Sequence, residues 1–164
     1  MSESPLAETA ADLPDAPSVC RGIQRLFARN DVWLLPEMPL RNGRRADLMG
    51  LDPKGRIIIV EVKVQRGDLL GDGKWPDYLD FCDRFYWGLA PHLDRAVLDE
   101  DSYRPECCGI VVADGYDGEI VRPAPLQPLA AARRKTEVER LVRAVLRRST
   151  VAGDPHCAAW GNVD

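Results

Sequence analysis

The chain has 164 residues, of which 45% are hydrophobic and 29% are charged, and its formal net charge is −4. This length suits one globular domain with a hydrophobic core, and the composition excludes a wholly disordered chain. The sequence contains no apolar run of about 18 residues, so we expect no membrane-spanning helix and no membrane partner.

The two ends of the chain are predicted to lie outside the domain. Residues 1–17 are acidic, contain no Lys or Arg and are rich in small residues and proline, which predicts a disordered tail. We expect the domain over residues 18–149 and a short tail over 150–164. The 5 cysteines include no Cys-x-x-Cys pair, which favours a reducing cytoplasm over a disulfide-bonded or zinc-binding protein.

The first predicted elements are a helix and an edge strand. Apolar residues recur at helical spacing over 19–29, and Ser18 is positioned to cap that helix. Residues 32–41 have an extended pattern interrupted by prolines, which suits the edge of a sheet. Asn42-Gly43 then predicts a two-residue hairpin turn.

The remaining pattern alternates strands with helices. The expected elements are strands over 44–51 and 56–64, a helix over 66–83 that breaks near Gly71 and Gly73, strands over 85–89, 109–113 and 117–122, and a helix over 127–148. The last helix has an apolar side formed by Leu129, Ala132, Val138, Leu141, Val142, Val145 and Leu146. This order predicts a single α/β domain with a central mixed sheet and helices on both faces.

One hairpin places two carboxylates opposite each other. The sequence at 52–55, Asp-Pro-Lys-Gly, has the residues of a type I turn closed by a glycine bulge, which gives a three-residue loop. The resulting register sets Asp47 opposite Glu61. It places Lys63 two residues further along the same face, opposite Arg45.

Two opposed carboxylates at this separation repel each other unless a proton or a cation lies between them. Hard divalent ions such as Mg²⁺ take oxygen ligands of this kind, and Lys63 adds a positive charge beside them. The trio of Asp47, Glu61 and Lys63 therefore predicts a metal site. The alternative is a solvent-facing strand on which Glu61 and Lys63 form a surface ion pair of little energetic value.

These residues resemble a known superfamily. Asp47, a hairpin and then Glu61-Val62-Lys63 is similar to the signature of the PD-(D/E)XK nucleases, with Ala46-Asp47 in place of the usual Pro-Asp. Over about residues 20–148 the chain also resembles the MmcB-like DNA-repair endonucleases of bacteria, through GRRADLMGLD, GIVVADGYDGEIVRPAP, LAAARRK and the run KW-x-x-Y-x-x-x-CD-x-FY. The resemblance implies a restriction-endonuclease-like α/β fold.

The same resemblance implies roles for individual residues. Asp47 and Glu61 would hold Mg²⁺, with Mn²⁺ as a substitute, and the Val62 carbonyl would be a further ligand. Lys63 would orient the attacking water or stabilise the transition state. The implied reaction is hydrolysis of phosphodiester bonds.

Glu37 is a candidate for a further catalytic acid, since related nucleases often supply one from the element before the aspartate. A two-residue turn at Asn42-Gly43 would place Met38, not Glu37, opposite Asp47. A one-residue slip or a bulge between the neighbouring prolines would instead bring Glu37 to the site. Both arrangements remain open at this point.

Candidate DNA contacts surround the predicted metal site, at Arg44, Arg45, Gln65, Lys74 and Tyr78. The two arginines precede the metal aspartate and, with Lys74, suit phosphate binding. Gln65 equally suits a polar strand end, and Tyr78 at this spacing is more typical of the core than of a base-stacking contact.

The residues and the resemblance together predict a Mg²⁺-dependent DNA endonuclease or nickase that acts in DNA repair. The first alternative is a catalytically inactive protein that keeps the nuclease fold as a DNA-binding or repair-complex scaffold. The second is an interaction domain that does not bind nucleic acid. DNA is the expected partner, and other DNA-repair proteins and a second copy of the chain are further candidates.

Overall fold

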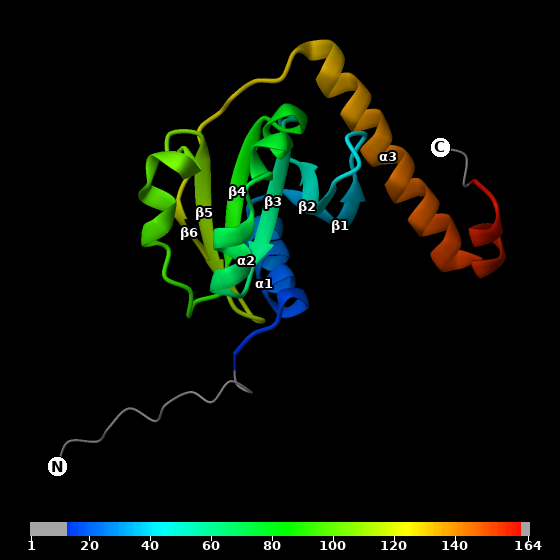
Figure 1. The fold of residues 1–164 in the computed structure, drawn as a ribbon. Coiled ribbons are helices and arrows are strands. Elements are labelled where there is room, and N and C mark those ends of the chain that lie inside the picture. The colour runs from blue at the N-terminus through cyan, green and yellow to red at the C-terminus, as the bar shows by residue number, and fades with distance from the viewer. Residues whose placement is uncertain (1–12, 162–164) are drawn as a thin grey trace.

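The computed structural model describes residues 13–161, so residues 1–12 of the predicted N-terminal tail and residues 162–164 lie outside the described part (Figure 1). Its helices, strands and 3-10 helices (η), in chain order, are α1 Ala16–Arg29, β1 Trp33–Pro39, β2 Arg45–Leu51, β3 Ile57–Lys63, α2 Arg66–Gly71, η2 Trp75–Phe81, β4 Arg84–Leu89, η3 Ala96–Asp99, η4 Asp101–Tyr103, β5 Cys108–Ala113, β6 Gly118–Arg122, α3 Ala131–Gly153 and η5 Pro155–Ala159. The helix predicted over 66–83 is thus divided into α2 and η2 at the expected glycines.

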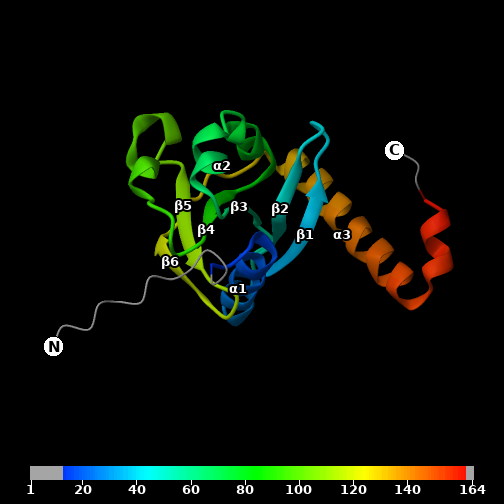
Figure 2. The same ribbon diagram turned by 60° about the horizontal axis from the view of Figure 1, so that its bottom comes forward.

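The six strands form one mixed sheet and lie in it in the order in which they occur in the chain. β1, β2 and β3 pair antiparallel, β3, β4 and β5 pair parallel, and β6 pairs antiparallel with β5. α1 packs on one face of the sheet, and α2, η2 and α3 lie on the other side (Figures 1 and 2). The prediction of an α/β domain with helices on both faces of a mixed sheet is confirmed.

α1 begins earlier than predicted and has a different cap. The Asp15 side chain accepts a hydrogen bond from the Ser18 N–H at 2.9 Å, so Asp15 is the N-cap and Ser18 lies within the first turn. Ala16 and Pro17, which the sequence assigned to the tail, are helical, because proline is favourable at the start of a helix. The predicted apolar stripe of α1 is buried.

α3 begins and ends later than predicted. Prolines precede it at 123, 125 and 128, and the Leu129 N–H donates to the Asp83 carboxylate at 2.8 Å, which keeps this stretch extended. The helix then continues to Gly153, so part of the predicted C-terminal tail is helical and η5 follows it. Neither α3 nor any other helix within residues 13–161 is long and apolar enough to span a membrane.

Most of the predicted apolar side of α3 is exposed. Leu141 is 5% exposed, whereas Val142, Val145 and Leu146 are 46%, 45% and 60% exposed. Figures 1 and 2 show the reason: α3 leans past the β1 edge of the sheet, and its C-terminal half extends away from the sheet. An apolar hollow of about 440 Å³ lies between α3 and strands β1 and β2, and it contains none of the predicted site residues.

Asp83, which belongs to the run KW-x-x-Y-x-x-x-CD-x-FY, joins three parts of the fold. It is 1% exposed, and its carboxylate accepts hydrogen bonds from the N–H groups of Ile57 and Leu129, both at 2.8 Å, and from the Arg134 guanidinium. Burial raises the pKa of Asp83, but the hydrogen bonds from Arg134 and the backbone outweigh burial, and the pKa is lowered overall. One carboxylate thereby connects the start of β3, the segment before α3 and α3 itself.

The aromatic residues of the same run belong to the core. Trp75 lies against Phe85 and Trp87, with ring centroids 5.7 and 5.5 Å apart, and Tyr78 stacks on Phe85 at 6.2 Å. The spacing of these residues in the sequence is therefore explained by the packing of η2 on β4.

Candidate metal and nucleic-acid site

The β2–β3 hairpin has the predicted loop and register. The Asp52 N–H donates to the Arg56 carbonyl at 3.0 Å, and Gly55 has a φ of +75°, as a glycine bulge requires. Pairing extends in the predicted register from the loop to Leu48 and Val60, and ends one position before the predicted carboxylates.

Beyond that point, two hydrogen bonds from backbone N–H groups to carboxylate side chains connect β2 and β3. The Asp47 N–H donates to Glu61 Oε1 at 3.1 Å, and the Val62 N–H donates to Asp47 Oδ2 at 2.8 Å. Each carboxylate therefore holds a backbone N–H of the opposite strand. The structure brings Asp47 and Glu61, hereafter the carboxylate pair, together between β2 and β3.

The alternation of side chains shifts at Asp47. Ala46 packs in the same core cluster as Met49, whereas strict alternation predicts that it shares a face with Leu48. β1 bends at Glu37, where the backbone is left-handed with a φ of +53°. The regular sheet is thus interrupted on two neighbouring strands at the level of the carboxylate pair.

The turn before β2 is one residue longer than predicted. The Leu40 N–H donates to the Arg44 carbonyl at 2.7 Å and Gly43 has a φ of +84°, so the loop has three residues instead of two. Met38 consequently pairs with Ala46, which is the one-residue slip that the sequence left open. The left-handed glycine makes the longer loop possible, and the predicted two-residue turn is wrong.

Glu37 stays outside the site despite this slip. Its side chain is 68% exposed, and its carboxylate lies 3.7 Å from the Arg45 guanidinium. Arg148 of α3 donates to the carbonyls of Pro36 and Glu37 and so holds the bent backbone. The structure does not bring the Glu37 carboxylate to the carboxylate pair.

Burial makes the carboxylate pair electrostatically unfavourable. Glu61 is 5% exposed, and burial followed by the charge of Asp47 raises its pKa well above the usual range. Burial also raises the pKa of Asp47, against the hydrogen bond from Val62 and the charge of Lys63. The pair therefore favours a bound proton or a cation.

The carboxylate pair opens into a polar cleft of about 560 Å³. The lining residues are Arg44, Arg45, Asp47, Glu61, Val62, Lys63, Gly67, Asp68, Gly71, Asp72 and Tyr78. Glu37, Gln65 and Lys74, which were also predicted as site residues, do not line it.

Asp72 is a cleft residue that the sequence pattern did not indicate. Its Oδ2 lies 3.0 Å from Lys63 Nζ. The glycines at 71 and 73 predicted a break in the helix, but the sequence contains no signal that the residue between them reaches β3.

The arginines predicted to contact DNA are held by carboxylates. Arg44 Nε donates to Asp77 at 2.9 Å, and Arg45 lies beside Glu37. Arg45 and Lys63 both line the cleft, but they do not form a ladder pair, because the pairing of β2 with β3 ends at Leu48 and Val60. Tyr78 is a core residue whose hydroxyl donates to the Arg45 carbonyl at 3.2 Å and reaches the cleft.

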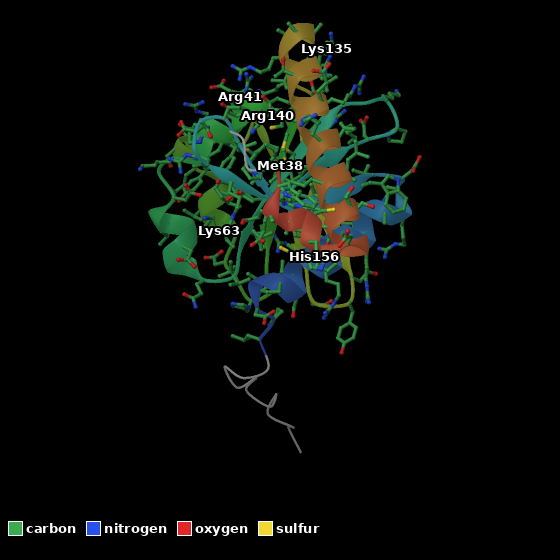
Figure 3. The ribbon with its side chains drawn as sticks, turned by 90° about the vertical axis from the view of Figure 1, so that its right-hand side faces the viewer. Met38, Arg41, Lys63, Lys135, Arg140 and His156 are labelled. Atoms are coloured by element: carbon green, nitrogen blue, oxygen red, sulfur yellow. The ribbon has the colours of Figure 1, made fainter. Side chains whose placement is uncertain are left out.

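Gln65 directly precedes α2, and Lys74 directly precedes η2. Both side chains are exposed. α3 begins with a basic run that includes Lys135, and Figure 3 shows that Lys63 lies well away from Lys135. The beginning of α3 and the cleft are therefore separate surfaces.

The oxygen atoms at this site suit Mg²⁺, although they are few. Within residues 13–161, no three His, Cys, Asp or Glu side chains come close enough together to hold a metal ion. Mg²⁺ is commonly bound through one or two carboxylates while it keeps several waters. The carboxylate pair, with the Val62 carbonyl as a further candidate ligand, is consistent with that mode of binding.

Comparisons with known proteins agree with the family resemblance. The family model described as DNA repair protein MmcB-like matches residues 4–156. A solved protein of unknown function from Silicibacter pomeroyi is 36% identical in sequence, with a TM-score of 0.79, over 93% of this chain and 99% of its own. The chain has no match among curated proteins. The structural similarity therefore extends over nearly the whole chain.

Proposed function

Because the chain belongs to the MmcB-like family of DNA repair proteins, we propose that it is a Mg²⁺-dependent endonuclease or nickase that hydrolyses phosphodiester bonds in DNA. The proposal also assigns the chain to the PD-(D/E)XK superfamily. Support comes from the hairpin, which carries Asp47 on β2 and Glu61-Val62-Lys63 on β3.

The observation that carries the proposal is the carboxylate pair. Its two side chains are largely buried, and one oxygen of each is fixed by a backbone N–H of the neighbouring strand. Desolvated like charges destabilise a fold unless they are compensated, and such arrangements concentrate at functional sites. A divalent cation supplies that compensation.

Six residues of the cleft have a part in the proposed reaction. Mg²⁺ held by Asp47 and Glu61, with the Val62 carbonyl, would supply positive charge to the scissile phosphate and its attacking water. Lys63 donates a hydrogen bond to a phosphate oxygen as charge develops there. Arg44 and Arg45 hold flanking phosphates after exchanging their carboxylate partners for DNA.

Nicking of supercoiled plasmid in Mg²⁺ or Mn²⁺ tests this proposal. We expect cleavage by the wild type, no cleavage in EDTA, and at least a 100-fold loss in Asp47→Asn and Glu61→Gln. Those substitutions keep the oxygen that accepts the backbone N–H, so the fold is retained. The control variant is Glu139→Gln, which removes one exposed carboxylate from α3 and leaves cleavage unchanged.

Cleavage and DNA-binding assays on the wild-type protein distinguish the alternative functions. If plasmid, single-stranded and branched DNA remain intact while salt-sensitive DNA binding persists, the protein is a DNA-binding scaffold. If DNA does not bind at low salt, it is an interaction domain of another kind. Anomalous density between Asp47 and Glu61 in a crystal soaked in Mn²⁺ would support the metal site independently of activity.

A further inference from the structure

Lys63 is held by a single carboxylate inside the cleft. Its Nζ lies 3.0 Å from Asp72 Oδ2, and the side chains of Lys63 and Asp72 are only 14% and 15% exposed. The ion pairs made by Arg44 and Arg45 at the cleft are more exposed. The contact between Lys63 and Asp72 is therefore the least solvent-screened ion pair among those at the cleft.

The Asp72 carboxylate is oriented by its own turn. Asp72 Oδ1 accepts the Lys74 N–H at 3.3 Å, and the Gly73 N–H donates to the Gly71 carbonyl at 3.1 Å. One carboxylate oxygen thus faces the connection between α2 and η2, and the other faces Lys63. The hydrogen bond from the Lys74 N–H therefore orients the Asp72 side chain toward Lys63.

The Lys63 ammonium shares the cleft with the carboxylate pair and interacts with it electrostatically. Its charge lowers the pKa of both Asp47 and Glu61, although burial raises each pKa by more. A lysine side chain is long and flexible, and the partly buried Lys63 ammonium is expected to pair with the nearest available carboxylate. Without Asp72, that acceptor is the carboxylate pair.

We propose that Asp72 is a positioning residue that holds Lys63 on the α2 side of the cleft and so leaves the carboxylate pair to a divalent cation. If Lys63 moved onto Asp47 and Glu61, its ammonium would neutralise them and occupy the place of the metal. The catalytic consequence rests on the proposed function. The competition between Lys63 and a cation concerns metal binding alone.

The test is a double-mutant cycle on Mg²⁺ affinity, measured by titration calorimetry on the full chain without DNA. We expect Asp72→Asn to weaken Mg²⁺ binding at least tenfold and Lys63→Met to bind no more weakly than the wild type. In the double variant, the affinity returns to within threefold of Lys63→Met, because no ammonium remains to compete. The inference is overturned if Asp72→Asn weakens binding by the same factor in both backgrounds, since that result indicates only the loss of a nearby negative charge.

Asp68→Asn is the matched control, because Asp68 also lines the cleft and lies in α2, directly before the connection that contains Asp72. This substitution also removes one negative charge from the cleft but leaves the ion pair between Lys63 and Asp72 in place. We therefore expect less than a threefold change in Mg²⁺ affinity. Asp72→Glu should recover part of the lost affinity. If Asp72→Asn does not fold, Asp72→Ser takes its place, because a serine hydroxyl can also accept the Lys74 N–H.

The outcome separates this inference from the proposed function. If the wild type takes up neither Mg²⁺ nor Mn²⁺, both fail. If the wild type binds Mg²⁺ and the two substitutions act independently, only the role of Asp72 fails. In the nicking assay, Asp72→Asn should raise the Mg²⁺ concentration needed for half-maximal cleavage at least tenfold; an unchanged requirement would count against the role of Asp72.

Discussion

Asp83 and Arg134 form an ion pair between the sheet and α3, with the carboxylate fully enclosed and the guanidinium 29% exposed. The two residues are separated by 51 positions in the chain. The same carboxylate also accepts two backbone N–H groups, so its loss would leave several donors without a partner. Asp83 is therefore one of the residues that attach α3 to the sheet.

Asp83→Ala should lower the free energy of unfolding by about 3–5 kcal/mol, because it removes the ion-pair partner of a partly buried guanidinium and the acceptor of two backbone N–H groups, of which that of Ile57 is buried. Urea denaturation followed by circular dichroism measures the change. Asp80→Ala, at an exposed position of the same segment, is the control and should change stability by less than about 0.5 kcal/mol. A loss below about 1 kcal/mol in Asp83→Ala would contradict the anchoring role.

The stabilisation from Asp83 should disappear in acid. Its pKa is lowered in the folded protein, so its contribution is fully present above the unfolded value of about 3.9 and is lost as the pH falls through the folded value. The difference in unfolding free energy between the wild type and Asp83→Asn should therefore be constant from about pH 6 to about pH 5, which lies above the unfolded pKa, and shrink below about pH 4. If this difference grew as the pH fell, it would contradict a lowered pKa for Asp83 in the folded protein.

Glu61→Gln should stabilise the metal-free protein at alkaline pH. The pKa of Glu61 is raised in the folded state, so the ionised group costs stability above that value and the cost vanishes as the pH falls. A tenfold difference in proton affinity between the folded and unfolded states corresponds to about 1.4 kcal/mol of stability. Thermal unfolding in EDTA should show a higher Tm for the variant near pH 9 than for the wild type, and Mg²⁺ should raise the Tm of the wild type alone.

Gly22→Ala should destabilise the protein by about 3 kcal/mol. A Cβ at Gly22 would lie 1.9 Å from the Asp114 carbonyl oxygen and 2.9 Å from that of Asp117, so α1 must move away from the turn between β5 and β6. Gly153→Ala is the control, since a Cβ there meets no atom within 4 Å, and it should be neutral or stabilising by up to about 1 kcal/mol. Equal effects in both variants would contradict the close approach of α1.

Leu141→Ala should cost about 2–5 kcal/mol, because Leu141 anchors α3 in the core. Leu146→Ala, further along the helix, should change the stability of the monomer by less than about 0.5 kcal/mol, because its side chain is 60% exposed. Chemical denaturation at low protein concentration compares the two. A large effect at Leu146 would show that α3 packs more closely than its exposure indicates.

Features that depend on neighbouring residues could be predicted from the amino-acid sequence. Turn residues at 52–55 set the β2–β3 register, because glycine at the bulge adopts a positive φ and side chains alternate with a period of two. The turn residues and the alternation were therefore sufficient to predict that Asp47 and Glu61 lie close together. The turn at Gly43 shows the limit of predicting register from turn residues. Asn-Gly suits two loop lengths, and the one adopted shifts the register of β1.

Contacts between separate helices and strands could not be predicted from the sequence, because they depend on how these elements pack together. The apolar spacing of α3 predicted a buried side, but the helix meets the sheet along too short a length to cover Val145 and Leu146. The contacts of Asp72 with Lys63 and of Asp83 with Arg134 depend on how helical segments settle on the sheet. Periodicity and turn chemistry act over a few residues, whereas these contacts arise from the packing of whole elements.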